Sequence, residues 1–175
     1  MKKVYDLARA DLGTWEWADG HNPKVVKYFA DVGHEWVKDD ETAWCAAFVG
    51  SKLKQAGLPH TGKLNARSYL DWGTPVALKD AKEGDIVVFS RGNPNGWQGH
   101  VAFFVEESGS TIRVLGGNQS NQVNVSAYPK SRLLGIRRAE QKATYTVLKN
   151  PTKVSPLRAL VNAILQIIKA LGITK

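Results

Sequence analysis

Cysteine is nearly absent from this chain of 175 residues, which contains one cysteine and one methionine. A single cysteine excludes an internal disulfide and a metal site built from several cysteines, so folding does not depend on an oxidising compartment. Internal repeats and low-complexity segments are also missing. The chain has no zinc-finger spacing, no RNA-recognition aromatic motif and no heptad-linked basic region, so we expect no nucleic-acid partner.

We expect no secretory signal peptide at the start of the chain. The segment 1–7 carries two lysines but no apolar core and no small-residue cleavage site. We therefore expect synthesis in the cytoplasm.

The charge of the chain is strongly basic. Lysine and arginine number 24 against 16 acidic residues, which gives a net charge of +8 and an isoelectric point of about 9.6. This charge favours polyanionic partners such as anionic cell-envelope polymers or lipid headgroups. It is equally consistent with a basic surface that only keeps the protein soluble.

The first half of the chain has the apolar spacing of helices. Helices are predicted over 5–12, from Pro23 with Asn22 as the N-cap, from near Thr42 to Gly57, and over 66–72 with Asn65 as the cap. From about residue 82 the pattern changes to short apolar runs between turn residues. Strands are predicted over 84–89, 100–106, 111–115, 122–126 and 132–136.

Helices followed by a strand meander define the α+β class, with N-terminal helices packed on an antiparallel sheet of five to six strands. We expect a catalytic domain over 1–140, a polar linker over 141–154 and a C-terminal amphipathic helix over 155–175. With 43% hydrophobic residues, the chain is long enough for one well-buried core.

The only cysteine, Cys45, lies at the start of the third predicted helix, after the polar run 39–42. A thiol in the first helical turn is near unpaired N–H groups and the positive end of the helix dipole, which predicts a lowered pKa and a reactive thiolate. A small buried hydrophobic residue is the alternative interpretation. Cys45 follows a polar segment and has a histidine downstream in the chain, which favours a role as nucleophile.

His100 is the best-placed base for such a nucleophile. It begins an apolar strand after a loop rich in glycine, asparagine and proline, whereas the other three histidines lie in polar segments. Asn118 is the candidate for orienting the imidazole, with Gln119 and Glu106 as rivals. The run Gly116-Gly117-Asn118 can also be a simple turn.

These segments together resemble a known family. The runs Thr42-Ala43-Trp44-Cys45-Ala46-Ala47-Phe48-Val49, Ala66-Arg67-Ser68-Tyr69-Leu70, Gly84-Asp85-Ile86-Val87-Val88-Phe89, Gly99-His100-Val101-Ala102-Phe103 and Leu115-Gly116-Gly117-Asn118-Gln119 resemble the CHAP-like amidohydrolase/peptidase group of phage and bacterial cell-wall enzymes, within the papain-like superfold. The resemblance spans about residues 1–138 and depends on the order and spacing of the runs.

The resemblance implies an enzyme that cleaves an amide bond in peptidoglycan, either an N-acetylmuramoyl-L-alanine amidase or a peptide-stem endopeptidase. It implies Cys45 as nucleophile and His100 as general base, with no cofactor. Many CHAP domains use an acidic third residue where this chain has Asn118. For substrate binding we expect Trp44 and Trp97, whose indoles can cover a sugar or a peptide stem, together with Gln119.

Some CHAP domains hold calcium near the cysteine, and the run Asp39-Asp40-Glu41 raises that question. Three contiguous acidic residues differ from the alternating carboxylates of a calcium loop. We therefore expect no metal. We expect these acidic residues to be solvated and to interact favourably with the positive end of the helix dipole.

The tail over 155–175 reads as a cationic amphipathic helix that is too short to span a bilayer. We expect it to bind anionic membrane or outer-membrane lipid; the alternative is packing on the domain or on another subunit. The residues expected at the membrane are Arg158, Leu160, Ile164, Ile168 and Lys169.

A phage endolysin, exported by a holin and acting on peptidoglycan, combines both halves. Two alternatives remain open at this point: a catalytically inactive envelope- or membrane-binding protein, and an interbacterial amidase effector.

Overall fold

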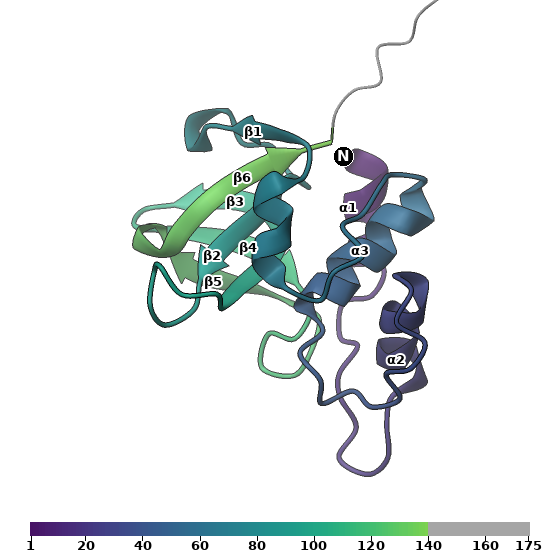
Figure 1. Ribbon diagram of the computed structural model, residues 1–175. Coiled ribbons are helices and arrows are strands. Elements are labelled where there is room, and N and C mark those ends of the chain that lie inside the picture. The colour runs from purple at the N-terminus through teal and green to yellow at the C-terminus, as the bar shows by residue number, and fades with distance from the viewer. Residues whose placement is uncertain (140–175) are drawn as a thin grey trace, which may run out of the picture. The chain divides into compact units, whose positions relative to one another are not determined.

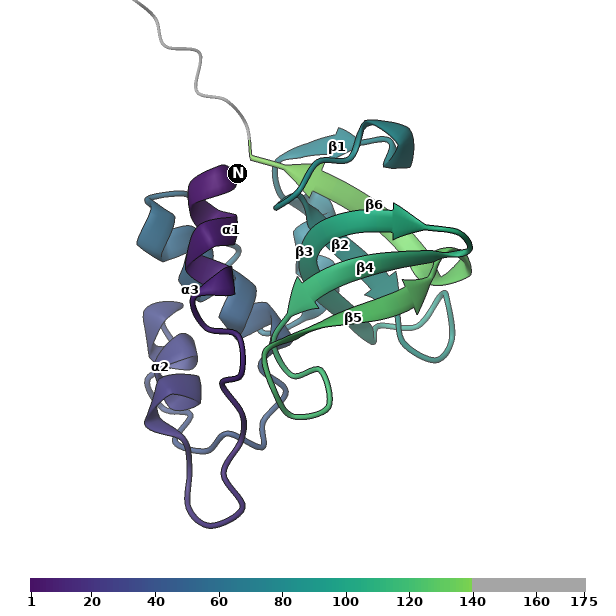
Figure 2. The ribbon, with the colours of Figure 1, turned by 180° about the vertical axis from the view of Figure 1, so that it is seen from behind.

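Three α-helices lie on one side of a six-stranded antiparallel sheet in residues 1–139 of the computed structural model, the part of the chain that the structure describes (Figures 1 and 2). The helices are α1 (Lys2–Arg9), α2 (Pro23–Asp31) and α3 (Cys45–Ala56). The strands are β1 (Thr74–Val76), β2 (Ile86–Ser90), β3 (Gly99–Ser108), β4 (Thr111–Gly116), β5 (Asn124–Pro129) and β6 (Leu133–Arg138). Short 3₁₀ helices are η1 (Ala66–Asp71), η2 (Leu78–Asp80) and η3 (Lys130–Arg132).

The sheet order is β1-β6-β2-β3-β4-β5, with every neighbouring pair antiparallel. The predicted α+β class is therefore confirmed, as are the five predicted strands. Strand β1 was not predicted, because it is three residues long and contains Pro75. The segment predicted as a fourth helix forms η1, with Asn65 capping it as predicted through a 2.8 Å bond from the Arg67 N–H.

Helix α3 is the central helix of the fold. It contacts α1, α2 and β3, and nine of its twelve residues are buried. Its polar neighbours are also organised: buried Lys52 forms an ion pair with Asp11, which accepts a 2.7 Å hydrogen bond from the Tyr28 hydroxyl. Because an unpaired buried charge is costly, this pairing holds α2 and the turn that follows α1 against α3.

Alternating residues of the central strands fill the two faces of the sheet. Val101 and Phe103 face the helices, whereas Ala102 and Phe104 belong to a second apolar cluster on the other face. At the end of β4, a Cβ on Gly117 would lie 2.4 Å from the ring of fully buried Trp44. Glycine is therefore required there for the close approach that brings the β4 end against the start of α3.

Candidate active site

Cys45 is the first residue of α3 and is 8% exposed. The backbone N–H groups of Val101 and Ala46 are near enough to its sulfur to favour the thiolate form. Val101 directly follows His100 on β3, so the sulfur lies against the strand that carries the predicted base. The helix begins at Cys45 itself rather than near Thr42.

Burial raises the pKa of the Cys45 thiol above its ordinary value. The Val101 and Ala46 N–H groups and the positive charge of Arg91 lower this pKa, but their effect is smaller than that of desolvation. The predicted lowering of the pKa is therefore wrong. Desolvation of the sulfur raises the pKa by more than the N–H groups at the helix start lower it, so the thiol is protonated at neutral pH.

His100 is also buried, with 7% exposure, and its ring stacks on Tyr128 at a centroid distance of 5.0 Å. The pKa of His100 is lowered to about 4, chiefly by burial and to a smaller extent by the charges of Arg91 and Arg132, against the effect of its hydrogen bond to Gln119. The imidazole is therefore neutral at pH 7. A neutral imidazole can accept a proton, which a general base requires.

The residue that holds His100 is Gln119, not Asn118. The Oε1 atom of Gln119 lies 3.0 Å from Nε2 of His100. Asn118 has a φ of 56°, in the left-handed region, and its side chain lines a neighbouring pocket instead. The third candidate, Glu106, forms an exposed ion pair with Arg113 far along β3.

Two of the predicted substrate contacts need correction. Trp44 is fully buried, and its indole N–H donates a 2.6 Å hydrogen bond to Glu16, so its ring is not available to a substrate. Gln119 is 3% exposed and bound to His100, so its position fits orientation rather than substrate binding. Trp97 is 73% exposed in the loop between β2 and β3 and stays a predicted contact.

The loop that carries Trp97 is held by Arg67 of η1. The guanidinium of Arg67 donates to the backbone carbonyls of Gln98, at 2.8 Å, and Pro94, at 3.0 Å. These bonds fix the two ends of an exposed turn and thereby place Trp97 at the rim beside β3. The loop was predicted as an active-site rim, but its anchor was not.

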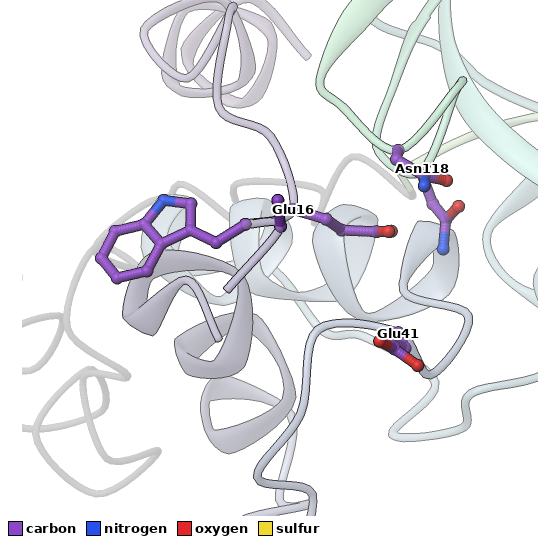
Figure 3. A pocket seen from close by; sticks show the side chains of 6 residues that line it. Glu16, Glu41 and Asn118 are labelled. Atoms are coloured by element: carbon purple, nitrogen blue, oxygen red, sulfur yellow. The ribbon is translucent and has the colours of Figure 1, made fainter. Parts of the chain in front are cut away.

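An open pocket of about 550 Å³ lies beside this site. Figure 3 shows Glu16 extending into it between Asn118 and Glu41. The full lining is Glu16, Trp17, Ala18, Glu41, Asn118 and Asn121. The pocket connects to the candidate catalytic residues along the chain, because Glu16 binds Trp44, which precedes Cys45, and Asn118 precedes Gln119.

Most of these pocket residues were missed by sequence reasoning, because they come from three separate segments with no shared motif. The one available signal was Glu16 between two tryptophans, in a loop of polar and glycine residues. The lining of the pocket is polar and carries two carboxylates, those of Glu16 and Glu41, so the pocket suits a ligand rich in N–H and O–H donors.

The three acidic residues before α3 differ in their exposure to solvent. Asp40 is fully buried and accepts hydrogen bonds from the backbone N–H groups of Trp17, at 3.0 Å, and Asn22, at 2.8 Å. Asp39 accepts from the N–H of Thr42 at 2.7 Å, and Glu41 is exposed at the pocket. The expectation of solvation is therefore wrong for Asp40, which fastens the loop before α2. Within residues 1–139, no cluster of three or more histidine, cysteine or acidic side chains is arranged to hold a metal ion.

Taken together, α3 starts at a cysteine and packs on a sheet whose strand β3 carries a histidine held by a glutamine, within an α+β fold of the papain-like kind. The family model of the CHAP domain matches residues 37–118, so the predicted resemblance is confirmed. This domain indicates a family of cysteine peptidase/amidase-type hydrolases that act on the cell wall. The match includes Cys45 and His100 and ends one residue before Gln119.

One solved structure with this fold is a lipoprotein-like protein of the NLP/P60 family from Staphylococcus aureus subsp. aureus Mu50. The similarity has a TM-score of 0.51 at 16% sequence identity, and covers 80% of this chain. The chain spans only 41% of that longer protein. No curated protein matches the sequence.

The predicted membrane-binding residues, Arg158, Leu160, Ile164, Ile168 and Lys169, lie outside the described residues. Within residues 1–139, none of the helices has the length and apolar character needed to cross a membrane.

Proposed function

We propose that this protein is a peptidoglycan hydrolase that cleaves an amide bond with Cys45 as nucleophile and His100 as general base. The observation that carries the proposal is the placement of the Cys45 sulfur beside the backbone of Val101 on β3, because Val101 directly follows His100, whose ring is held by a buried glutamine. The target bond is the muramoyl-alanine amide or an amide within the peptide stem.

The reaction begins from a neutral thiol and a neutral imidazole. His100 removes the proton from the Cys45 thiol as the sulfur attacks the carbonyl carbon of the substrate. Backbone N–H groups at the start of α3 stabilise the oxyanion of the tetrahedral intermediate. The C–N bond then breaks, and His100 gives its proton to the leaving amine.

Water completes the cycle. His100 takes a proton from a water molecule that attacks the thioester carbonyl, the C–S bond breaks, and the thiolate recovers that proton from His100. The products are one new amine and one new carboxyl group, whose added oxygen comes from water. The polar pocket of Figure 3 supports binding of one side of the substrate, because its carboxylates and amides can accept N–H and O–H groups.

Mass spectrometry of purified peptidoglycan digested in ¹⁸O-labelled water tests this proposal and identifies the bond. We expect fragments with new amine termini and with one ¹⁸O in each new carboxyl group. A free lactyl carboxyl on muramic acid indicates an amidase, and a carboxyl within the stem indicates an endopeptidase. Fragments that differ only by new reducing sugar ends, or no fragments, contradict the proposal.

We also propose that the protein acts as a phage endolysin, made in the cytoplasm and released by a holin, with the segment 155–175 engaging anionic lipid. The basic, acid-free character of 151–175 and its wide aliphatic face support this role. Truncation after Asn150 tests the lipid role. We expect it to leave hydrolysis of purified peptidoglycan unchanged and to reduce both binding to anionic vesicles and lysis of intact cells from outside. Unchanged vesicle binding and external lysis contradict the lipid role.

A further inference from the structure

The side-chain amide of Gln119 bridges two different partners. Its Oε1 end faces Nε2 of His100 at 3.0 Å, and its Nε2 end lies 2.7 Å from the backbone carbonyl of Asn124 and 2.9 Å from the Oδ1 atom of Asn124. A backbone carbonyl can only accept a hydrogen bond, so the NH₂ end of Gln119 must face Asn124. The oxygen end must then face the imidazole.

This direction fixes which nitrogen of His100 carries a proton. The Oε1 atom of Gln119 can only accept, so Nε2 of His100 must be the donor. A neutral imidazole has one N–H group, which leaves Nδ1 with a free lone pair. Nδ1 is therefore the nitrogen that can act as base.

Asn124 is itself locked in one orientation. It is the first residue of β5, and its Nδ2 donates a 2.8 Å hydrogen bond to the backbone carbonyl of Gln119. Its Oδ1 accepts from Gln119 and, at 2.7 Å, from the Ser126 hydroxyl. Gln119 and Asn124 thus bind one another at both ends, across the loop that joins β4 to β5.

We propose that Asn124 is a positioning residue: it sets the direction of the Gln119 amide and thereby selects the His100 tautomer with its base at Nδ1. The catalytic meaning of this role rests on the proposed function, but the tautomer is a property of the resting protein. Asn124 acts through Gln119 rather than on the substrate.

The ¹⁵N chemical shifts of the His100 ring, measured on the full chain without substrate, test the proposal directly. We expect a protonated, pyrrole-type Nε2 and an unprotonated, pyridine-type Nδ1. A protonated Nδ1 in the wild-type protein overturns the proposal without any variant.

Three substitutions separate positioning from stability. Asn124→Leu removes both side-chain contacts to Gln119 at similar size and leaves only the backbone carbonyl of residue 124 to accept from its NH₂ group. We expect a detectable second His100 tautomer and a kcat up to about tenfold lower with little change in KM, a fraction of the 10² to 10⁴ that general base catalysis contributes. Asn124→Asp keeps an acceptor for the Gln119 NH₂ group and should keep the wild-type tautomer. Ser126→Ala removes one bond to Asn124 without touching Gln119 and should keep it too.

A wild-type tautomer population in Asn124→Leu overturns the proposal, as does loss of that population in both Asn124→Asp and Ser126→Ala. The ring shifts separate this proposal from the proposed function. A wild-type protein that shows the expected tautomer but releases no peptidoglycan fragments supports the positioning role and contradicts the hydrolase.

Discussion

Replacing Cys45 by alanine is expected to reduce peptidoglycan hydrolysis by at least about 1,000-fold, since removal of a nucleophile leaves only binding and oxyanion stabilisation. The chain has no second cysteine that could substitute for it. The rate of turbidity loss of a purified peptidoglycan suspension, at equal protein concentration, measures the effect. The fold should persist, because the change removes one sulfur atom from a helix with eight other buried residues.

Two further variants show whether the loss of hydrolysis results from loss of the nucleophile or from loss of folding stability. Cys45→Ser keeps the shape of the side chain and should be as inactive as Cys45→Ala, because a serine hydroxyl is a much weaker nucleophile without its own activation. Ser51→Ala is the control on the same helix. It removes the 2.6 Å hydrogen bond from buried Ser51 to Asp31, and should lower the melting temperature while leaving hydrolysis below that temperature unchanged. Hydrolysis by Cys45→Ala near the wild-type rate contradicts the nucleophile assignment.

The second large effect concerns pH and His100. Because the pKa of His100 is lowered to about 4, kcat/KM for peptidoglycan hydrolysis should stay high down to about pH 5 and fall below about pH 4, as the base becomes protonated. A histidine with its ordinary pKa of 6.5 would give a decline more than two pH units higher. A pH profile of initial rates, with KM and kcat separated, distinguishes the two.

The same pKa difference affects folding stability. Above pH 6.5 His100 is neutral in both the folded and unfolded states and contributes no pH dependence. Between pH 6.5 and about 4 the unfolded chain takes up a proton that the folded protein excludes, so the free energy of unfolding falls as pH falls. The full loss, complete below pH 4, is about 3 kcal/mol, at 1.36 kcal/mol for each pKa unit.

Denaturant unfolding at pH 7, 5 and 4 measures this loss, with His100→Gln as the matched variant. The variant should have a smaller loss of stability over this range, and subtracting it removes the contribution of His60, whose pKa burial also lowers. Titration of the His100 ring proton by NMR gives the pKa of the folded protein directly. A value near 6.5, or equal pH dependence in both proteins, contradicts the expected effect.

Much of the fold was predictable because local signals agreed with the tertiary structure. Asn22 and Pro23 start α2 as predicted, and the Asn22 side chain accepts a 2.9 Å hydrogen bond from the Lys24 N–H. The strands around His100 follow their apolar runs, because their alternating side chains fill the two apolar clusters. The short edge strand β1 has no such signal, since its pairing with β6 depends on residues about sixty positions away.

The candidate site was predictable only in part. The positions of Cys45 and His100 follow from a helix start and a strand start. The choice between Asn118 and Gln119 depends on a backbone turn, with φ of 56° at Asn118, that directs neighbouring side chains to different places. The ionisation of Cys45 and the burial of Trp44 depend on packing by distant segments, which sequence spacing does not reveal.

The two edge strands of the sheet affect how the protein behaves when it is concentrated at a surface. An edge strand has unpaired N–H and C=O groups that can recruit a strand from another molecule. Here β1 contains Pro75 and β5 ends at Pro129, and proline has no N–H group to donate. Both edge strands of the sheet in residues 1–139 therefore disfavour the addition of a strand from another molecule, which protects the folded domain against aggregation at high local concentration.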